Sequence, residues 1–168
     1  MPGSALAAGP IDDTLWLRVA DAIDRPILFR WQTEAYRAYI ETLWGWDESW
    51  QQRDFERLFA ALTPRVVMQR TEDGSRAVGY IQTQRRSQAL HLANIVLRPG
   101  SRGQGTGTRL LRHMQTQAAQ ARCAVTLKVF RCNERARVFY QRLGFVETSR
   151  NRTHFVLRWA PIGIDESL

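Results

Sequence analysis

The sequence has few cysteines, almost no lysine and no long hydrophobic run. Its only cysteines, Cys123 and Cys132, lack the spacing of a metal site, so we expect reduced thiols and no bound metal. No apolar stretch approaches the roughly 18 residues that a membrane-spanning helix needs. The N-terminus also lacks the basic and apolar segments of a signal peptide. These absences predict a cytoplasmic protein with no membrane partner.

Positive charge comes almost entirely from arginine. Lysine and arginine together number 24 against 16 acidic residues, Lys128 is the sole lysine, and the net charge is +8. A nucleic-acid-binding protein usually gathers such charge in one patch, whereas these arginines are spread along the chain. Nucleic acid is therefore a minority interpretation, and part of the charge can serve a polyanionic cofactor.

Length and composition predict one folded unit. The chain has 168 residues, of which 44% are hydrophobic, which is enough to bury a core. Residues 1–10 are rich in Ala, Gly, Pro and Ser and offer little to pack. We therefore expect a mobile tail over residues 1–13 and a single domain over residues 14–168.

Apolar spacing and turn residues predict a mixture of strands and helices. Asp24 can cap a helix that continues to Trp44, where Gly45 stops it, and Asp47 or Glu48 can begin a second helix. Further strands are predicted at 14–19, 66–68, 77–84, 91–97, 125–130, 145–146 and 154–159, and further helices at 110–121 and 133–143. This order predicts a mixed α/β fold.

The most informative stretch of the chain is residues 95–111. A short apolar strand, Ile95–Leu97, ends at Pro99 and Gly100, and glycines then occupy positions 103, 105 and 107, where a helix begins. These glycines leave the first backbone N–H groups and the positive end of the helix dipole open to an anion. Arg102 can add a forked cationic donor. The stretch therefore predicts a pyrophosphate site.

Other glycine-rich motifs fit this stretch less well. A dinucleotide-binding fold needs G-x-G-x-x-G and an acidic residue about 20 positions later, but here the spacing is G-x-G-x-G, with no Asp or Glu from Gly100 through Asn133. A P-loop needs a lysine directly after its last glycine, and the sole lysine lies far outside the loop. A glycine-rich turn without a ligand would leave a weakened helix start unexplained.

Two motifs resemble those of a known superfamily. Residues 102–107, RGQGTG, resemble the R-x-x-G-x-G motif of the GNAT superfamily of acetyl-CoA-dependent N-acetyltransferases. Residues 133–145, NERARVFYQRLGF, are similar to the superfamily's N-x-x-A-x-x-F-Y-x-x-L-G-F helix. The resemblance covers roughly residues 15–159. It implies a GNAT fold with a mostly antiparallel central sheet of about seven strands and about four helices, and acetyl-CoA as the cofactor.

The resemblance also implies roles for individual residues. Tyr140 matches the tyrosine that acts as general acid near the cofactor sulfur, although it would also pack on an apolar helix face. Asn133 matches an asparagine that contacts the cofactor, and it can equally cap the helix. The other residues implied for cofactor binding are Ile95, Val96, Leu97, Arg102, Gly103, Gln104, Gly105, Thr106, Gly107 and Thr108.

The general base is less well defined by the sequence. Ribosomal-protein alanine acetyltransferases have a Glu in a strand motif L-E-V, where this chain has Leu127-Lys128-Val129. His91 lies near the place where other members carry a Glu or a His, and an ordinary histidine pKa near 6.5 suits the task. An ordinary surface position on a strand is an equal alternative for His91.

Superfamily members usually bind the acceptor between the first two helices. The residues of this chain implied for acceptor binding are Glu41, Trp44, Trp46 and Asp47. Indoles beside carboxylates suit a cationic or aromatic amine, although helix caps and core tryptophans are an alternative. The implied reaction is N-acetylation of a small-molecule or peptide amine, and homodimers are common in the superfamily. The alternative function is a non-catalytic acyl-CoA-binding module.

Overall fold

The computed structural model describes residues 5–164. The strands are β1 (Gly9–Pro10), β2 (Leu15–Val19), β3 (Arg65–Thr71), β4 (Gly74–Arg86), β5 (Ala89–Leu97), β6 (Ala124–Phe130), β7 (Val146–Arg150) and β8 (His154–Trp159). The helices are α1 (Arg25–Trp44), α2 (Glu48–Ala61), α3 (Thr106–Gln120) and α4 (Glu134–Arg142), with 3-10 turns at Ala22–Asp24 and Pro99–Ser101. The predicted mixed α/β fold is confirmed.

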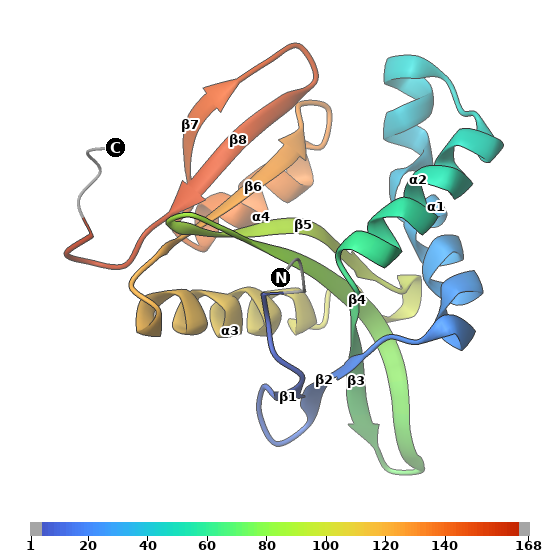
Figure 1. Cartoon of the computed structure of the whole chain (residues 1–168), viewed down its shortest axis with the longest axis horizontal. Coiled ribbons are helices and arrows are strands. Elements are labelled where there is room, and N and C mark those ends of the chain that lie inside the picture. Colours follow the sequence, from blue (N-terminus) through green and yellow to red (C-terminus); the bar gives the residue numbers. More distant parts are fainter. Residues whose placement is uncertain (1–4, 165–168) are drawn as a thin grey trace.

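One sheet of eight strands organises the domain, in the order β1-β2-β3-β4-β5-β6-β8-β7 (Figure 1). All pairs are antiparallel except β5 with β6, which are parallel and joined through α3. The predicted sheet of about seven strands is thus confirmed, and the additional strand is β1, which has only two residues. The parallel pair sits at the centre and creates the feature that shapes the site.

The two central strands separate part of the way along their length. β5 pairs with β6 only from Ala89 to Leu92, after which β6 continues beside β8 alone. The register between β4 and β5 also shifts between Gln82 and Thr83, opposite the point where the separation begins. Beyond Leu92, β5 therefore has an open edge toward β6 that pairs with no strand. Backbone groups at such an edge can bind a ligand.

Helices cover both faces of the sheet and bury two apolar clusters. On one face α3 and α4 pack over a large cluster that includes Leu111, Leu127 and Leu157. On the other face α1 and α2 lie side by side and cover a smaller cluster around Tyr80 and Val96 (Figure 1). Because α1 and α2 sit over β3, β4 and β5, the open edge of β5 lies between the helical layers.

Two local predictions differ from the structure. Within the predicted tail of residues 1–13, Leu6 is buried, its N–H donates to Thr83 Oγ1 at 3.0 Å, and β1 pairs with β2. One leucine and one strand pair fix a segment whose composition suggested little packing; residues 1–4 lie outside the described part. Asp24 does not cap α1, because its carboxylate binds the Arg18 guanidinium at 2.7 Å and the N–H of Asp21 instead.

Among residues 5–164, none of the helices is both long enough and apolar enough to cross a membrane. This agrees with the lack of a long apolar run in the sequence.

Candidate active site

The glycine loop ends in an uncovered helix N-terminus. Gly103 and Gly105 adopt φ angles of +73° and +80°, a left-handed conformation that favours glycine. A Cβ added at either position would meet no atom within 4 Å, so the space over the loop is open. The helical hydrogen bonds begin with the N–H of Arg109 donating to Gly105 O, which leaves the preceding N–H groups of α3 without a helical acceptor. The loop therefore fits a pyrophosphate.

Other residues of the loop serve its shape. Gly107 lets α3 approach α4, because a Cβ there would lie 3.4 Å from the Phe139 ring. Gln104 donates its side-chain N–H to Gly100 O at 3.1 Å, which closes the loop on itself. Thr106 is buried. Gln104 and Thr106 are thus predicted cofactor-binding residues that do not line the cavity described below.

The open edge of β5 presents backbone groups from alternate residues. Arg102 Nε donates to Leu97 O at 3.0 Å, and the Tyr36 hydroxyl donates to Ile95 O at 3.1 Å. Both carbonyls therefore point away from β4. Because backbone direction alternates along a strand, Val96 directs its polar groups toward β4. Of the predicted segment Ile95–Leu97, the two outer residues offer their backbone to a ligand.

The helix α4 brings a tyrosine and an asparagine to the same space. Asn133 caps α4 by accepting the N–H of Ala136 at 3.1 Å, and it lines the cavity as well. The Tyr140 ring packs against Phe139 and Phe145, while its hydroxyl forms no hydrogen bond with any described residue. Burial raises the pKa of Tyr140 above its usual value, so the phenol stays protonated around neutral pH. Its hydroxyl is available to donate a hydrogen bond to a ligand.

His91 lies in the part of β5 that still pairs with β6, just before the two strands separate. Its Nδ1 lies 3.0 Å from Thr126 Oγ1, and the residue lines the cavity. Desolvation, followed by the charges of Arg86 and Lys128, lowers the pKa of His91 to about 4. The imidazole is therefore neutral at pH 7.

This lowered pKa predicts a pH-dependent stability. The unfolded chain binds a proton at His91 near its ordinary pKa of 6.5, whereas the folded chain does so near 4. The free energy of unfolding therefore decreases as the pH falls from about 6.5 to about 4. His91→Gln removes this contribution, so we expect the stability difference between wild type and variant to change across that window in denaturant titrations. A constant difference would show that His91 does not titrate in this way.

One cavity of about 1550 Å³ connects these groups. It reaches from the glycine loop, along the open edge of β5, to a space enclosed by α1, α2 and the face of the sheet. The predicted site residues that line it are His91, Ile95, Val96, Leu97, Arg102, Gly103, Gly105, Gly107, Thr108, Asn133, Tyr140, Trp44 and Asp47. The tertiary structure thus brings together residues from four parts of the sequence.

Two predicted acceptor residues lie outside this cavity. Glu41 forms an exposed ion pair with Arg37 at 2.7 Å, and the Trp46 indole donates to Glu48 Oε2 at 2.6 Å. Arg37 also lies over the Trp46 ring at 5.3 Å. These side chains are engaged with each other on the surface, and neither Glu41 nor Trp46 lines the cavity.

An aromatic cluster that we did not predict lines part of the acceptor space. Phe130 of β6 contacts His154 of β8, with ring centroids 4.6 Å apart, and Tyr39 of α1, with centroids 5.8 Å apart. Tyr36 and Trp44 complete the cluster. The helical spacing of Tyr36 and Tyr39 could have suggested a shared face, but nothing in the sequence pairs that face with Phe130.

Comparison with known proteins identifies the family. The acetyltransferase (GNAT) family matches residues 25–145, and the chain belongs to this family. A PaiA N-acetyltransferase from Thermoplasma acidophilum, solved with coenzyme A, has a similar fold, with a TM-score of 0.67 and 14% identity over 88% of this chain and 99% of that one.

Two further structures show the same fold. An Escherichia coli N-acetyltransferase that acts on an alanine of a ribosomal protein has a TM-score of 0.60 and 19% identity, over 92% and 98% of the two chains. A Salmonella typhimurium acetyltransferase that modifies the N-terminal serine of a ribosomal protein has a TM-score of 0.66 and 16% identity, over 93% and 99%. The family uses acetyl-CoA, so acetyl-CoA-dependent acetylation is the class of reaction of this protein.

Proposed function

We propose that this protein transfers the acetyl group of acetyl-CoA directly to a primary amine of a small molecule or peptide. The observation that carries the proposal is one cavity that joins an uncovered helix N-terminus, an open strand edge, an acceptor space and a tyrosine hydroxyl that has no hydrogen-bond partner among the described residues. A family member that only bound the cofactor would not need the last two features. When bound, acetyl-CoA supplies an activated acetyl thioester.

The residues of the loop and the strand hold and orient the cofactor in this proposal. The N–H groups at the start of α3 and the Arg102 guanidinium bind the two phosphates. Ile95 and Leu97 pair their backbone with the amide groups of the pantetheine arm, so Tyr36 and Arg102 exchange their present carbonyl partners. A backbone N–H of this open edge also stabilises the negative charge that develops on the acetyl oxygen.

Two residues handle protons in this proposal. Tyr140 would donate its hydroxyl proton to the sulfur as the carbon–sulfur bond breaks, and solvent would then return a proton to the phenolate. His91 accepts the proton that the attacking amine loses, either directly or through water. Its pKa of about 4 makes it a weak base, so the imidazole passes this proton on to solvent. Trp44 and Asp47 line the acceptor space and favour a cationic amine before it loses its proton.

A panel of amines tests this function. We expect thiol release from acetyl-CoA to depend on an added primary amine, with mass spectrometry showing a product heavier by one acetyl group. The panel should include a diamine, an aminoglycoside, free amino acids and peptides with free N-termini. Tight binding of acetyl-CoA without turnover on any of these amines would favour the non-catalytic binding module.

A further inference from the structure

One face of the sheet carries basic residues that extend from the acceptor space. Residues opposite each other in neighbouring strands project on the same side, and the register aligns His91 with Thr126 and Thr126 with Arg158. His91 lines the cavity, so this row belongs to the cavity face. The opposite face of β6 and β8 buries Leu127 and Leu157 in the core.

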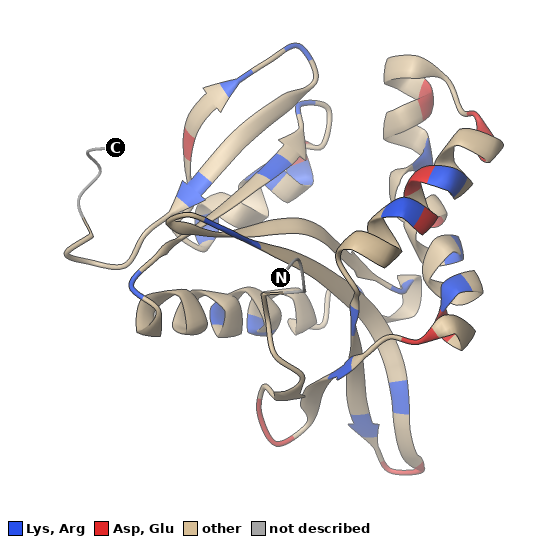
Figure 2. Cartoon of the chain, in the orientation of Figure 1, with Lys and Arg blue, Asp and Glu red and all other residues tan. Residues whose placement is uncertain are grey.

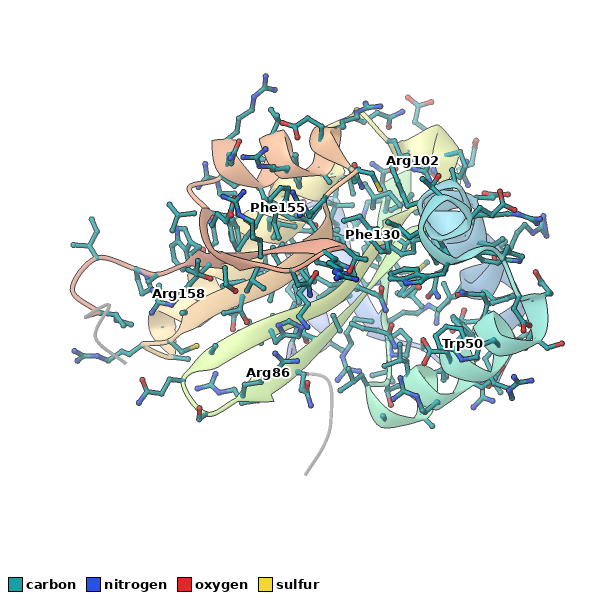
Figure 3. All side chains as sticks on the ribbon, turned by 90° about the horizontal axis from the view of Figure 1, so that it is seen from above. Trp50, Arg86, Arg102, Phe130, Phe155 and Arg158 are labelled. Atoms are coloured by element: carbon teal, nitrogen blue, oxygen red, sulfur yellow. The ribbon has the colours of Figure 1, made fainter. Side chains whose placement is uncertain are left out.

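Three cations lie on this face, and we call them the basic strip: Lys128, Arg158 and Arg86. Lys128 is two residues beyond Thr126 and lines the cavity, while Arg158 lies in the Thr126 row. Arg86 lies two residues beyond Gln84, which is paired with His91. Figure 3 shows Arg86 and Arg158 toward one end of these strands and Phe130 toward the other. The strip therefore runs away from the cavity in one direction.

Among the described residues, the strands that carry the basic strip place no acidic residue beside it. The strands β4, β5, β6 and β8 contain no Asp or Glu. The only acidic residue of β7, Glu147, is paired in register with the core residue Leu157, and its carboxylate binds Arg150 at 2.7 Å. None of the three cations of the strip forms an ion pair with a described residue. Figure 2 shows these strands with basic residues and the acidic residues mainly elsewhere.

The charges of the strip also act on the cavity. Lys128 lowers the pKa of both His91 and His154, and Arg86 lowers that of His91, in each case after desolvation. The titratable and charged groups that β4, β5, β6 and β8 place beside the cavity and the strip are thus two histidines and three cations. From the helices, Asp47, Asp54 and Glu134 also line the cavity. A chain that leaves the acceptor space along the strip meets only basic and neutral side chains of β4, β5, β6 and β8.

We propose that the acceptor is the N-terminal amine of a peptide or protein whose next residues are acidic, and that the basic strip binds those residues. This rests on the proposed acetyltransferase function. The aromatic cluster around Phe130 lines the cavity toward the opposite end of these strands from Arg86 and Arg158. A chain that lies along the strip therefore directs its terminal amine into the acceptor space. Arg86, Arg158 and Lys128 lie in three successive rows of the sheet, and rows two residues apart are separated by about 7 Å along a strand. The strip therefore has about the length of four residues of an extended peptide.

Matched peptides test the proposal. Two peptides share length and first residue and carry either Glu or Gln at the next four positions. We expect kcat/KM for thiol release to favour the Glu peptide by roughly 10-fold, since exposed ion pairs are individually weak and three act together. The preference should decrease as salt is added.

Charge variants locate the effect. Arg158→Glu and Lys128→Gln should each reduce the ratio of the two kcat/KM values, and Arg158→Glu combined with Arg86→Glu should abolish it. Arg30→Glu, an equal charge change on the exposed side of α1, should keep the ratio. Circular dichroism confirms that each variant is folded. Equal rates for the Glu and Gln peptides would overturn the proposal and leave amine acetylation intact.

Other outcomes are distinguishable. If no amine is acetylated, the proposed function fails, and anisotropy of the two labelled peptides still tests the strip, with equal affinities overturning it. Tighter binding of a labelled oligonucleotide than of the Glu peptide would replace the proposal with nucleic acid. A dimer that Arg158→Glu dissociates, without any change in peptide preference, would assign the strip to a second copy of the chain.

Discussion

Replacing Gly105 by aspartate should abolish binding of acetyl-CoA. Gly105 directly precedes α3 and has nothing within 4 Å of an added Cβ, so the new carboxylate would project into the open space over the loop. A like charge about 4–5 Å from a phosphate costs about 3 kcal/mol at the effective dielectric of a protein surface. We therefore expect the Kd of acetyl-CoA, measured by calorimetry, to rise at least roughly 100-fold.

The control for Gly105→Asp is Gly105→Asn. Asparagine has the same shape as aspartate and tolerates the left-handed conformation at φ +80° better than most residues. It should therefore bind acetyl-CoA far more tightly than the aspartate variant, with a similar melting temperature. Retained micromolar binding by Gly105→Asp would show that the loop does not hold the pyrophosphate.

Tyr140→Phe should lower kcat by about 100-fold, the usual contribution of a positioned general acid. The Kd of acetyl-CoA should stay nearly constant, because the ring and its packing against Phe139 and Phe145 remain. The free energy of unfolding should change little, since the hydroxyl forms no hydrogen bond with a described residue and its removal leaves no partner unsatisfied. Steady-state kinetics measures kcat, calorimetry measures the Kd of acetyl-CoA, and denaturant titration measures the free energy of unfolding.

Tyr80→Phe is a matched control with the opposite pattern. The Tyr80 hydroxyl donates to Gln32 Oε1 at 2.5 Å inside the core under α1. Its loss should cost about 1 kcal/mol of stability and leave the leaving-group step intact. If Tyr140→Phe keeps full kcat at saturating substrate, Tyr140 is a packing residue and the proton comes from elsewhere.

Local sequence was sufficient for most of the helices and strands and for the shape of the glycine loop. Glycine at 103 and 105 is required by positive φ angles, and the cap at Asn133 follows from its own side chain. These features depend on a few neighbouring residues, so a short window of sequence contains their cause. The same holds for the α1 and α2 boundaries, where Gly45 and Asp47 act within one turn.

Contacts between residues far apart in the chain could not be predicted from local sequence. The packing of Leu6 against the domain depends on a partner 77 positions away, at Thr83. Glu41 and Trp46 have suitable chemistry for an acceptor site, yet Arg37 engages both on the surface. No local rule indicates which of several nearby indoles and carboxylates turns inward.

The sequence by itself determined the order of strands and helices, the left-handed glycine loop at the start of α3 and the family's two motifs, because each is a property of adjacent residues. Only the tertiary structure decided that β5 separates from β6 beyond Leu92, that Phe130 and His154 line the acceptor space together, and that Lys128, Arg158 and Arg86 share one face. Those features depend on strand pairing and register between segments far apart in the chain, and a shift of one residue would send every side chain to the other face.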